Sequence, residues 1–372
     1  MTHRRIIFAT VSSILAASLI VDARAAQENS PVFVNGGTVD SDAAVHIPAI
    51  TIPFSSYASP QAKSSFLAYQ KFITTYTGML NRPMSEQRRM EAERLTPALQ
   101  RAQALYAVDT KPTVIGGVRT DVVTPKEGVS DRNKSRVLIS LHGGGFESGT
   151  PVLRALESIP AASVGRIKVV AVDYRQGPES KFPAATQDVT AVYRELLKTY
   201  KPRNIGIYGC SAGGMLTAEA IAWFEKEKLP LPGAIGIFCA SAGGWHGGDS
   251  GALSGALTGA PPPYHPAEPP HPSVSNKAYF SDVDIDDPLV SPINSNAVLS
   301  KFPPTLIVTS SRDGAFSPAI YTHKQLVKLG VDADLHVWDG LIHAFFATQP
   351  ELPESREVWD VVTKFFDKHL DQ

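Results

Sequence analysis

Short apolar segments that end in turn residues recur along the chain from residue 113 onward. Their apolar residues are consecutive rather than alternating, which is typical of strands buried on both faces of a parallel sheet. Segments with helical spacing, such as residues 186–200 and 317–330, lie between them. This repetition of strand and helix predicts an α/β domain with a doubly wound sheet. The expected strands begin near Arg136, Ile167, Asn204, Gly233, Pro304 and Asp332.

Two further segments with helical spacing precede this pattern, at residues 60–80 and 85–106. We interpret residues 26–112 as an N-terminal extension with a helical cap, with ordinary packing helices as the alternative. The main α/β domain is expected to span residues 113–372. Within it, residues 245–276 are rich in Gly and Pro, and they predict a surface excursion near the edge where the strands end.

The composition is that of a folded protein without a large net charge. Hydrophobic residues make up 43% of the chain and charged residues 19%, which is enough to bury a large core. Lys and Arg number 35 and Asp and Glu 36, and the basic residues form no long cluster that could follow a phosphate backbone. Nucleic acid is therefore excluded as an expected partner.

The first 25 residues have the order of a secretory signal peptide. Basic residues precede an apolar stretch at residues 6–21, and a small-x-small pattern ends at Ala25. We expect cleavage after Ala25, an exported protein that is periplasmic or extracellular, and no stable membrane insertion afterwards. An uncleaved anchor is the alternative, but the apolar stretch is shorter than the ~20 residues of a spanning helix.

A candidate nucleophile lies in the motif Gly209-x-Ser211-x-Gly213, which follows an apolar strand and precedes a helix-forming segment. A serine needs an exposed hydroxyl and a base, and a turn from strand to helix exposes the hydroxyl if small residues permit the cramped backbone. The chain repeats Ser-Ala-Gly-Gly at Ser241, but Cys239 stands there in place of the first glycine and a glycine-rich loop follows. We therefore interpret Ser241 as a decoy.

Candidates for the other parts of an acyl-transfer site lie at the ends of neighbouring strands. The run from His142 to Gly145 follows the first long strand, and its glycine amides suit a tetrahedral oxyanion. Asp313 and His343 follow the last two strands, in the chain order nucleophile, acid, base. The competing candidates lie inside elements or beside them: Asp339 for the acid, and His323 or His336 for the base.

Several ordered motifs give the chain a family resemblance over residues 114–369. HGGGF, DYRQGPESKFPAATQD, GCSAGG, DDPLVSPIN, PPTLIVTSSRDG and GLIHAFF occur in this order. Together they resemble the hormone-sensitive-lipase-like family of α/β-hydrolases, which are bacterial carboxylesterases with the His-Gly-Gly-Gly motif. The resemblance implies an α/β-hydrolase fold with a mostly parallel eight-stranded sheet, helices on both faces and an N-terminal helical cap.

The resemblance also implies a role for each matching residue. Ser211 is the expected nucleophile, His343 the base and Asp313 the residue that orients it. The expected oxyanion hole consists of the amides of Gly144, Gly145 and Ala212, and His142 and Gly143 are expected to support that loop. Three residues of the DYRQGPE segment are expected to be structural: Asp173, Arg175 and Glu179. No metal or cofactor is required by this chemistry.

The chain departs from the family pattern at two places. Cys210 precedes the serine where the family usually has an acidic residue, and Ala315, Phe316 and Ser317 replace acidic residues that often follow the aspartate. Neither departure removes a catalytic atom, so both concern substrate range and pH optimum. If the strands before Cys210 and Cys239 are neighbours, the two thiols lie close together. Both a disulfide between them and two free thiols are then compatible with the sequence.

The expected activity is hydrolysis of small-molecule carboxylic esters by an exported serine hydrolase. A lactonase or an amidase with the same three residues is an alternative, because the sequence does not reveal the shape of the pocket. A non-catalytic binding protein on the same scaffold is a remote alternative, since no member of the triad is missing. The oligomeric state does not follow from the sequence.

Overall fold

The computed structural model describes residues 36–41, 43–76, 82–243, 247–259 and 278–370. The chain divides into two compact units, residues 1–53 and residues 54–372. In the first unit, β1 (Thr38–Val39) and β2 (Val45–His46) pair antiparallel. The expected signal peptide at residues 1–25 lies outside the described residues, as do residues 245–246 and 260–276 of the expected excursion.

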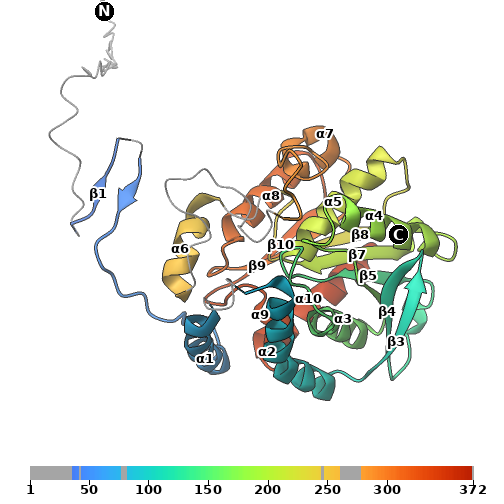
Figure 1. Cartoon of the computed structure of the whole chain (residues 1–372), viewed down its shortest axis with the longest axis horizontal. Coiled ribbons are helices and arrows are strands. Elements are labelled where there is room, and N and C mark those ends of the chain that lie inside the picture. Colours follow the sequence, from blue (N-terminus) through green and yellow to red (C-terminus); the bar gives the residue numbers. More distant parts are fainter. Residues whose placement is uncertain (1–35, 42, 77–81, 244–246, 260–277, 371–372) are drawn as a thin grey trace, which may run out of the picture. The chain divides into compact units, whose positions relative to one another are not determined.

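The second unit is built on an eight-stranded sheet with the order β10-β9-β8-β7-β5-β6-β4-β3 (Figure 1). The strands β5 to β10 run parallel, whereas β4 pairs antiparallel with both β3 and β6. This confirms the fold class expected from the sequence. The first two strands of the sheet, β3 and β4, are not among the six strand positions expected from the sequence, the first of which was near Arg136. The strands are β3 (Val108–Ile115), β4 (Val118–Pro125), β5 (Val137–Leu141), β6 (Lys168–Val172), β7 (Ile205–Cys210), β8 (Ala234–Phe238), β9 (Thr305–Ser310) and β10 (Ala333–Trp338).

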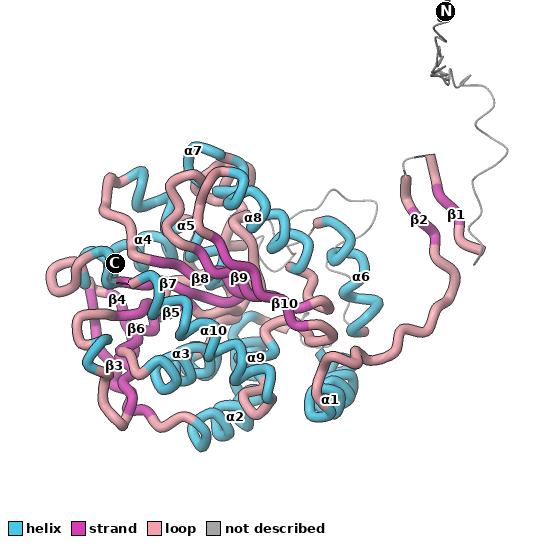
Figure 2. Tube along the Cα trace, turned by 180° about the vertical axis from the view of Figure 1, so that it is seen from behind, coloured by secondary structure: helices cyan, strands magenta, loops and turns pink. Residues whose placement is uncertain are grey.

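The central strands are buried along their whole length because helices cover both faces of the sheet (Figure 2). Successive side chains of a strand point to opposite faces, so Ile207 packs with the helices of one face and Tyr208 with those of the other. One face carries α4 (Ala184–Leu196), α5 (Ala212–Lys226) and α8 (Phe316–Lys328). The other carries α2 (Met84–Leu105), α3 (Pro151–Gly165) and α10 (Pro353–His369).

The two helices expected near the N-terminus are present as α1 (Pro60–Tyr76) and α2. The helix α2 packs against α3, and Arg88 on α2 forms an ion pair with Glu179. The helix α1 is tied to α6 (Gly248–Thr258), because Gln70 donates a hydrogen bond to the Thr258 carbonyl at 2.6 Å. The excursion expected at residues 245–276 thus contains a helix. The short helices α7 (Asn296–Leu299) and α9 (Phe345–Thr348) complete the set among the described residues.

No helix in the described part of the chain combines the length and the apolar character that a membrane span needs.

We expect that Trp359→Ala lowers the free energy of unfolding by about 3–5 kcal/mol. Trp359 on α10 is fully buried and its ring lies 5.4 Å from that of Phe346, so its removal opens a cavity in the core. Urea unfolding measures the loss. Lys364→Ala on the exposed side of the same helix is the control, with an expected change within about 0.5 kcal/mol. Equal effects of the two substitutions would contradict the assigned core.

Candidate active site

Ser211 occupies a sharp turn between β7 and α5. Its backbone has φ 58° and ψ −121°, a conformation that strains a residue with a side chain. A Cβ atom on Gly209 would lie 2.3 Å from the Gly213 backbone, and one on Gly213 would lie 1.8 Å from the Leu141 oxygen. Both glycines of the motif are therefore required by close backbone contacts. The Ser211 amide donates a hydrogen bond of 2.8 Å to the Phe238 carbonyl, which fixes the turn to β8.

The glycine loop after β5 lies directly beside this turn. A Cβ atom on Gly143 would lie 3.3 Å from the Ser211 Cβ. The next two residues, Gly144 and Gly145, have φ values of 101° and 62° that favour glycine. Within the described residues, no hydrogen bond uses the amides of Gly144, Gly145 or Ala212, the first residue of α5. The turn is thus flanked by backbone donors that remain available to an oxyanion.

The His142 side chain packs beside the glycine loop and supports it. Its ring stacks on Tyr174 with a centroid distance of 4.2 Å, and its Nδ1 lies 2.7 Å from the Gly143 carbonyl oxygen. The Tyr174 hydroxyl donates a 2.6 Å hydrogen bond to the His142 carbonyl. Burial lowers the pKa of His142 to about 4, although the hydrogen bond to Gly143 opposes this shift. The ring is therefore neutral at ordinary pH, and its contacts hold the loop in place.

Asp313 and His343 form a hydrogen-bonded pair at the ends of β9 and β10. The distance from His343 Nδ1 to Asp313 Oδ1 is 2.8 Å, and the Ala315 amide donates to the same oxygen at 2.9 Å. Asp313 is 1% exposed, whereas the His343 side chain is 43% exposed. Partial burial lowers the pKa of His343, but the Asp313 charge outweighs it and raises the pKa above its usual value.

The pKa of Asp313 moves in the opposite direction. Burial raises it, but the attraction to His343 and the hydrogen bonds to the carboxylate outweigh burial, so the pKa lies below its usual value. The pair therefore consists of an ionised carboxylate and an imidazole whose basicity that carboxylate increases. One imidazole nitrogen is bound to Asp313, and the ring remains accessible to solvent.

Cys239, at the end of β8, connects the Ser211 turn with this pair. Its sulfur accepts a hydrogen bond from the Ala344 amide at 3.3 Å, and its thiol also bonds with the Asp313 carboxylate and the Cys210 thiol. Both cysteines are buried and free, so of the two open alternatives the structure has two thiols rather than a disulfide. One side chain thus touches the residue before Ser211, the acid and the residue after His343.

The same three side chains, of Cys239, Asp313 and His343, are also a candidate metal site. One ligand atom each from Cys239, Asp313 and His343 lies within 4.8 Å of the other two. However, the Asp313 oxygen and the His343 nitrogen are hydrogen-bonded at 2.8 Å, which is closer than two ligands of a tetrahedral zinc ion at about 2 Å from the metal. We therefore assign these atoms to proton chemistry.

The competing candidates from the sequence do not contact this pair among the described residues. Asp339 accepts a 2.7 Å hydrogen bond from the Ser311 hydroxyl, and His323 Nε2 lies 3.1 Å from the Ala333 carbonyl oxygen. His336 lies inside β10, and its ring stacks with that of Trp338 at a centroid distance of 6.2 Å. The side chains of these residues therefore have ordinary structural partners.

The second Ser-Ala-Gly-Gly copy does not form a nucleophile turn. The Ser241 hydroxyl is buried and donates a 2.6 Å hydrogen bond to the Gly243 carbonyl. No helix starts at the residue after Ser241, in contrast to α5 after Ser211. The differences between the two copies that the sequence shows thus correspond to different local structures.

Two features around the site were not expected from the sequence. Glu157 on α3 is buried and accepts a 2.9 Å hydrogen bond from the Gly143 amide. Its only signal in the sequence is a carboxylate within a mostly apolar helix. Ser317 exchanges hydrogen bonds with Ser250 of α6, whose hydroxyl also donates to the Gly314 carbonyl at 2.8 Å. The start of α6 is therefore fixed to the loop that carries Asp313.

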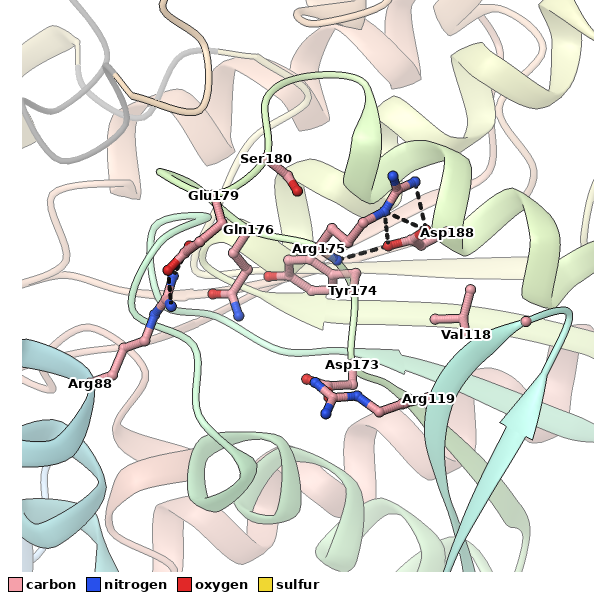
Figure 3. A pocket seen from close by; sticks show the side chains of 11 residues that line it. Arg88, Val118, Arg119, Asp173, Tyr174, Arg175, Gln176, Glu179, Ser180 and Asp188 are labelled. Carbon is pink, nitrogen blue, oxygen red and sulfur yellow. Dashed lines mark hydrogen bonds and ion pairs between the residues drawn. The ribbon is translucent and has the colours of Figure 1, made fainter. Parts of the chain in front are cut away.

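A separate polar cavity of about 380 Å³ lies among α2, the start of β4 and the segment after β6 (Figure 3). Its arginines have carboxylate partners: Arg88 pairs with Glu179, Arg119 with Asp173 and Arg175 with Asp188. The three residues expected to be structural, Asp173, Arg175 and Glu179, are members of these pairs. The pairs account for the charge that lines the cavity, and we assign no binding role to it.

Comparison with known proteins identifies relatives of this chain. The family described as having the alpha/beta hydrolase fold matches residues 138–347. An acetyl-hydrolase of Streptomyces hygroscopicus is 29% identical over 238 residues, which cover 63% of this chain and 76% of that protein.

Solved structures show the same fold. The esterase E25 is 26% identical with a TM-score of 0.72, and the match covers 87% of this chain and 98% of that one. An esterase from the bacterial hormone-sensitive lipase family shares the fold at 24% identity and a TM-score of 0.68, over 84% of this chain and 98% of that one. These findings confirm the family expected from the ordered motifs. The chain belongs to the α/β-hydrolase family.

Proposed function

We propose that the protein is a serine hydrolase that cleaves small carboxylic esters through an acyl-enzyme. The observation that carries this proposal is the 2.8 Å hydrogen bond between His343 and Asp313, which lies at the same edge of the sheet as the strained Ser211 turn. The unused amides beside Ser211 support it, because ester hydrolysis passes through an oxyanion. The relatives named as esterase and acetyl-hydrolase support it further, and they make acetyl esters the first substrates to test.

The proposed reaction has two halves. In the first, His343 accepts the Ser211 proton while the oxygen attacks the acyl carbon, and it then gives the proton to the departing alcohol. In the second, His343 accepts a proton from water, the resulting hydroxide attacks the acyl-enzyme, and the proton returns to Ser211 as the acid leaves. Asp313 holds the Nδ1 proton throughout, and the amides of Gly144, Gly145 and Ala212 bind the oxyanion in both halves.

We also propose that the protein acts outside the cytoplasm. The support is the order of the first 25 residues, in which basic residues precede an apolar stretch and a small-x-small pattern. On export, the mature chain is expected to begin at Ala26.

Replacing Ser211 by alanine is expected to lower kcat for p-nitrophenyl acetate by about 10⁴-fold or more, because no other group can form the acyl-enzyme. Initial rates of the purified variant measure this loss. Ser241→Ala is the matched control: it removes a hydroxyl that bonds the Gly243 carbonyl and the Gly243 amide, so kcat stays within about twofold even if some stability is lost. Lactones and amides are assayed in parallel, since the same steps cleave them. A Ser211→Ala variant with wild-type turnover would rule out the proposed nucleophile.

The pH profile is expected to depend on Asp313. Because Asp313 raises the pKa of His343 and only the neutral imidazole accepts a proton, kcat/KM should rise with pH through a pKa above the usual histidine value. Asp313→Asn should move this acid limb to lower pH and reduce kcat by roughly 10³- to 10⁴-fold. The Asp339 carboxylate bonds the Ser311 hydroxyl rather than His343, so Asp339→Asn should keep the wild-type pH profile. An acid limb that stays in place in Asp313→Asn would contradict the assigned pair.

Expression of the full chain with a C-terminal tag in a Gram-negative host is expected to yield a periplasmic protein that begins at Ala26. Cell fractionation and N-terminal sequencing measure this outcome. Replacing Ala23 and Ala25 by large residues should block cleavage, because signal peptidases require small side chains at these positions. A protein in the cytoplasm that retains Met1 would refute the proposed export.

A further inference from the structure

Glu157 is a buried carboxyl group between the oxyanion loop and the nucleophile turn. It lies on α3 and is 2% exposed. Its Oε1 accepts the 2.9 Å hydrogen bond from the Gly143 amide, and the backbone of Cys210 also stabilises its charged form. A Cβ on Gly143 would lie 3.4 Å from this oxygen and 3.3 Å from the Ser211 Cβ. The carboxyl is therefore in contact with both the oxyanion loop and the Ser211 turn.

The surroundings of Glu157 make its retention costly for stability. Among the described residues, no lysine or arginine forms an ion pair with it, and its Oε2 is buried without a hydrogen-bond partner. The titratable groups that face it are Tyr174 after β6, Tyr208 and Cys210 on β7, and His343 after β10. Burial raises its pKa to about 8, although the Gly143 amide, the Cys210 backbone and His343 oppose the shift. A carboxyl without a cationic partner in such a place destabilises the fold, so packing alone does not explain it.

We propose that Glu157 is a positioning residue, which fixes the oxyanion loop against the Ser211 turn. The proposal rests on the proposed esterase function. Glu157 acts on the reaction through its contacts with Gly143 and the Cys210 backbone. Its hydrogen bond to Gly143 sets the start of the loop whose next two amides, of Gly144 and Gly145, bind the oxyanion.

This role predicts a specific kinetic signature. The oxyanion exists only in the transition state and the tetrahedral intermediates, so a displaced loop lowers kcat while KM changes little. Displacement by about 1 Å is enough to cost up to about a hundredfold in rate.

Two substitutions separate the reach of the carboxyl from its charge. Glu157→Asp keeps the acid but shortens the side chain, which breaks the contact with Gly143; kcat should fall roughly 10- to 100-fold with KM within about threefold. The affinity for a boronic acid that forms a tetrahedral adduct on the serine should fall by a similar factor. Glu157→Gln keeps an oxygen acceptor for Gly143, so kcat should stay within about threefold of wild type.

Glu219 provides the matched control, because it is also a fully buried carboxyl but bonds Thr186 at 3.3 Å instead of the loop. Glu219→Asp should leave kcat and boronate affinity at wild-type values. Thermal unfolding confirms that each variant is folded. Wild-type kcat and boronate affinity in Glu157→Asp, a loss in Glu157→Gln as large as in Glu157→Asp, or an equal loss in Glu219→Asp would each overturn the proposal. An inactive wild-type enzyme would refute the esterase function instead, so the two failures are distinguishable.

Discussion

The contact between the end of β5 and the turn after β7 is the constraint on which the whole site depends. The two strands are neighbours and pair Leu141 with Gly209, so the chain must leave β7 within contact distance of the Leu141 carbonyl. Only glycine fits at positions 209 and 213, and the backbone between them is forced into a strained conformation. This single contact places the Ser211 hydroxyl, the first amide of α5 and the start of the glycine loop beside one another.

The remaining groups reach this point because parallel strands end at the same edge of the sheet. The strands β8, β9 and β10 lie in order beyond β7, and their ends supply Cys239, Asp313 and His343. Cys239 contacts Asp313 directly. It also contacts Cys210, which precedes Ser211, and Ala344, which follows His343. The sheet therefore determines the spacing of the groups, and a buried thiol, rather than a longer polar side chain, fills the gap between them.

The sequence predicted the parts of this arrangement that depend on strand periodicity and strand ends. The buried strands, the glycine turn and the residues that follow β9 and β10 all carry local signals. Glu157 could not be recognised, because a carboxylate on a helix is usually a solvent-exposed residue and only the tertiary structure shows that it is buried. The helix α6 was also missed, since its glycines have low helix propensity and its ends are held by Gln70 and Ser317, which lie far away in the sequence.

The strain at Ser211 has an evolutionary consequence. A non-glycine residue in such a backbone conformation costs of order 1–3 kcal/mol, and glycine would relieve most of that cost. Glycine at this position would thus yield a more stable chain with the same architecture and without a nucleophile. Selection for stability alone would favour glycine at position 211 and an inactive protein. A serine therefore persists here only while natural selection acts on turnover.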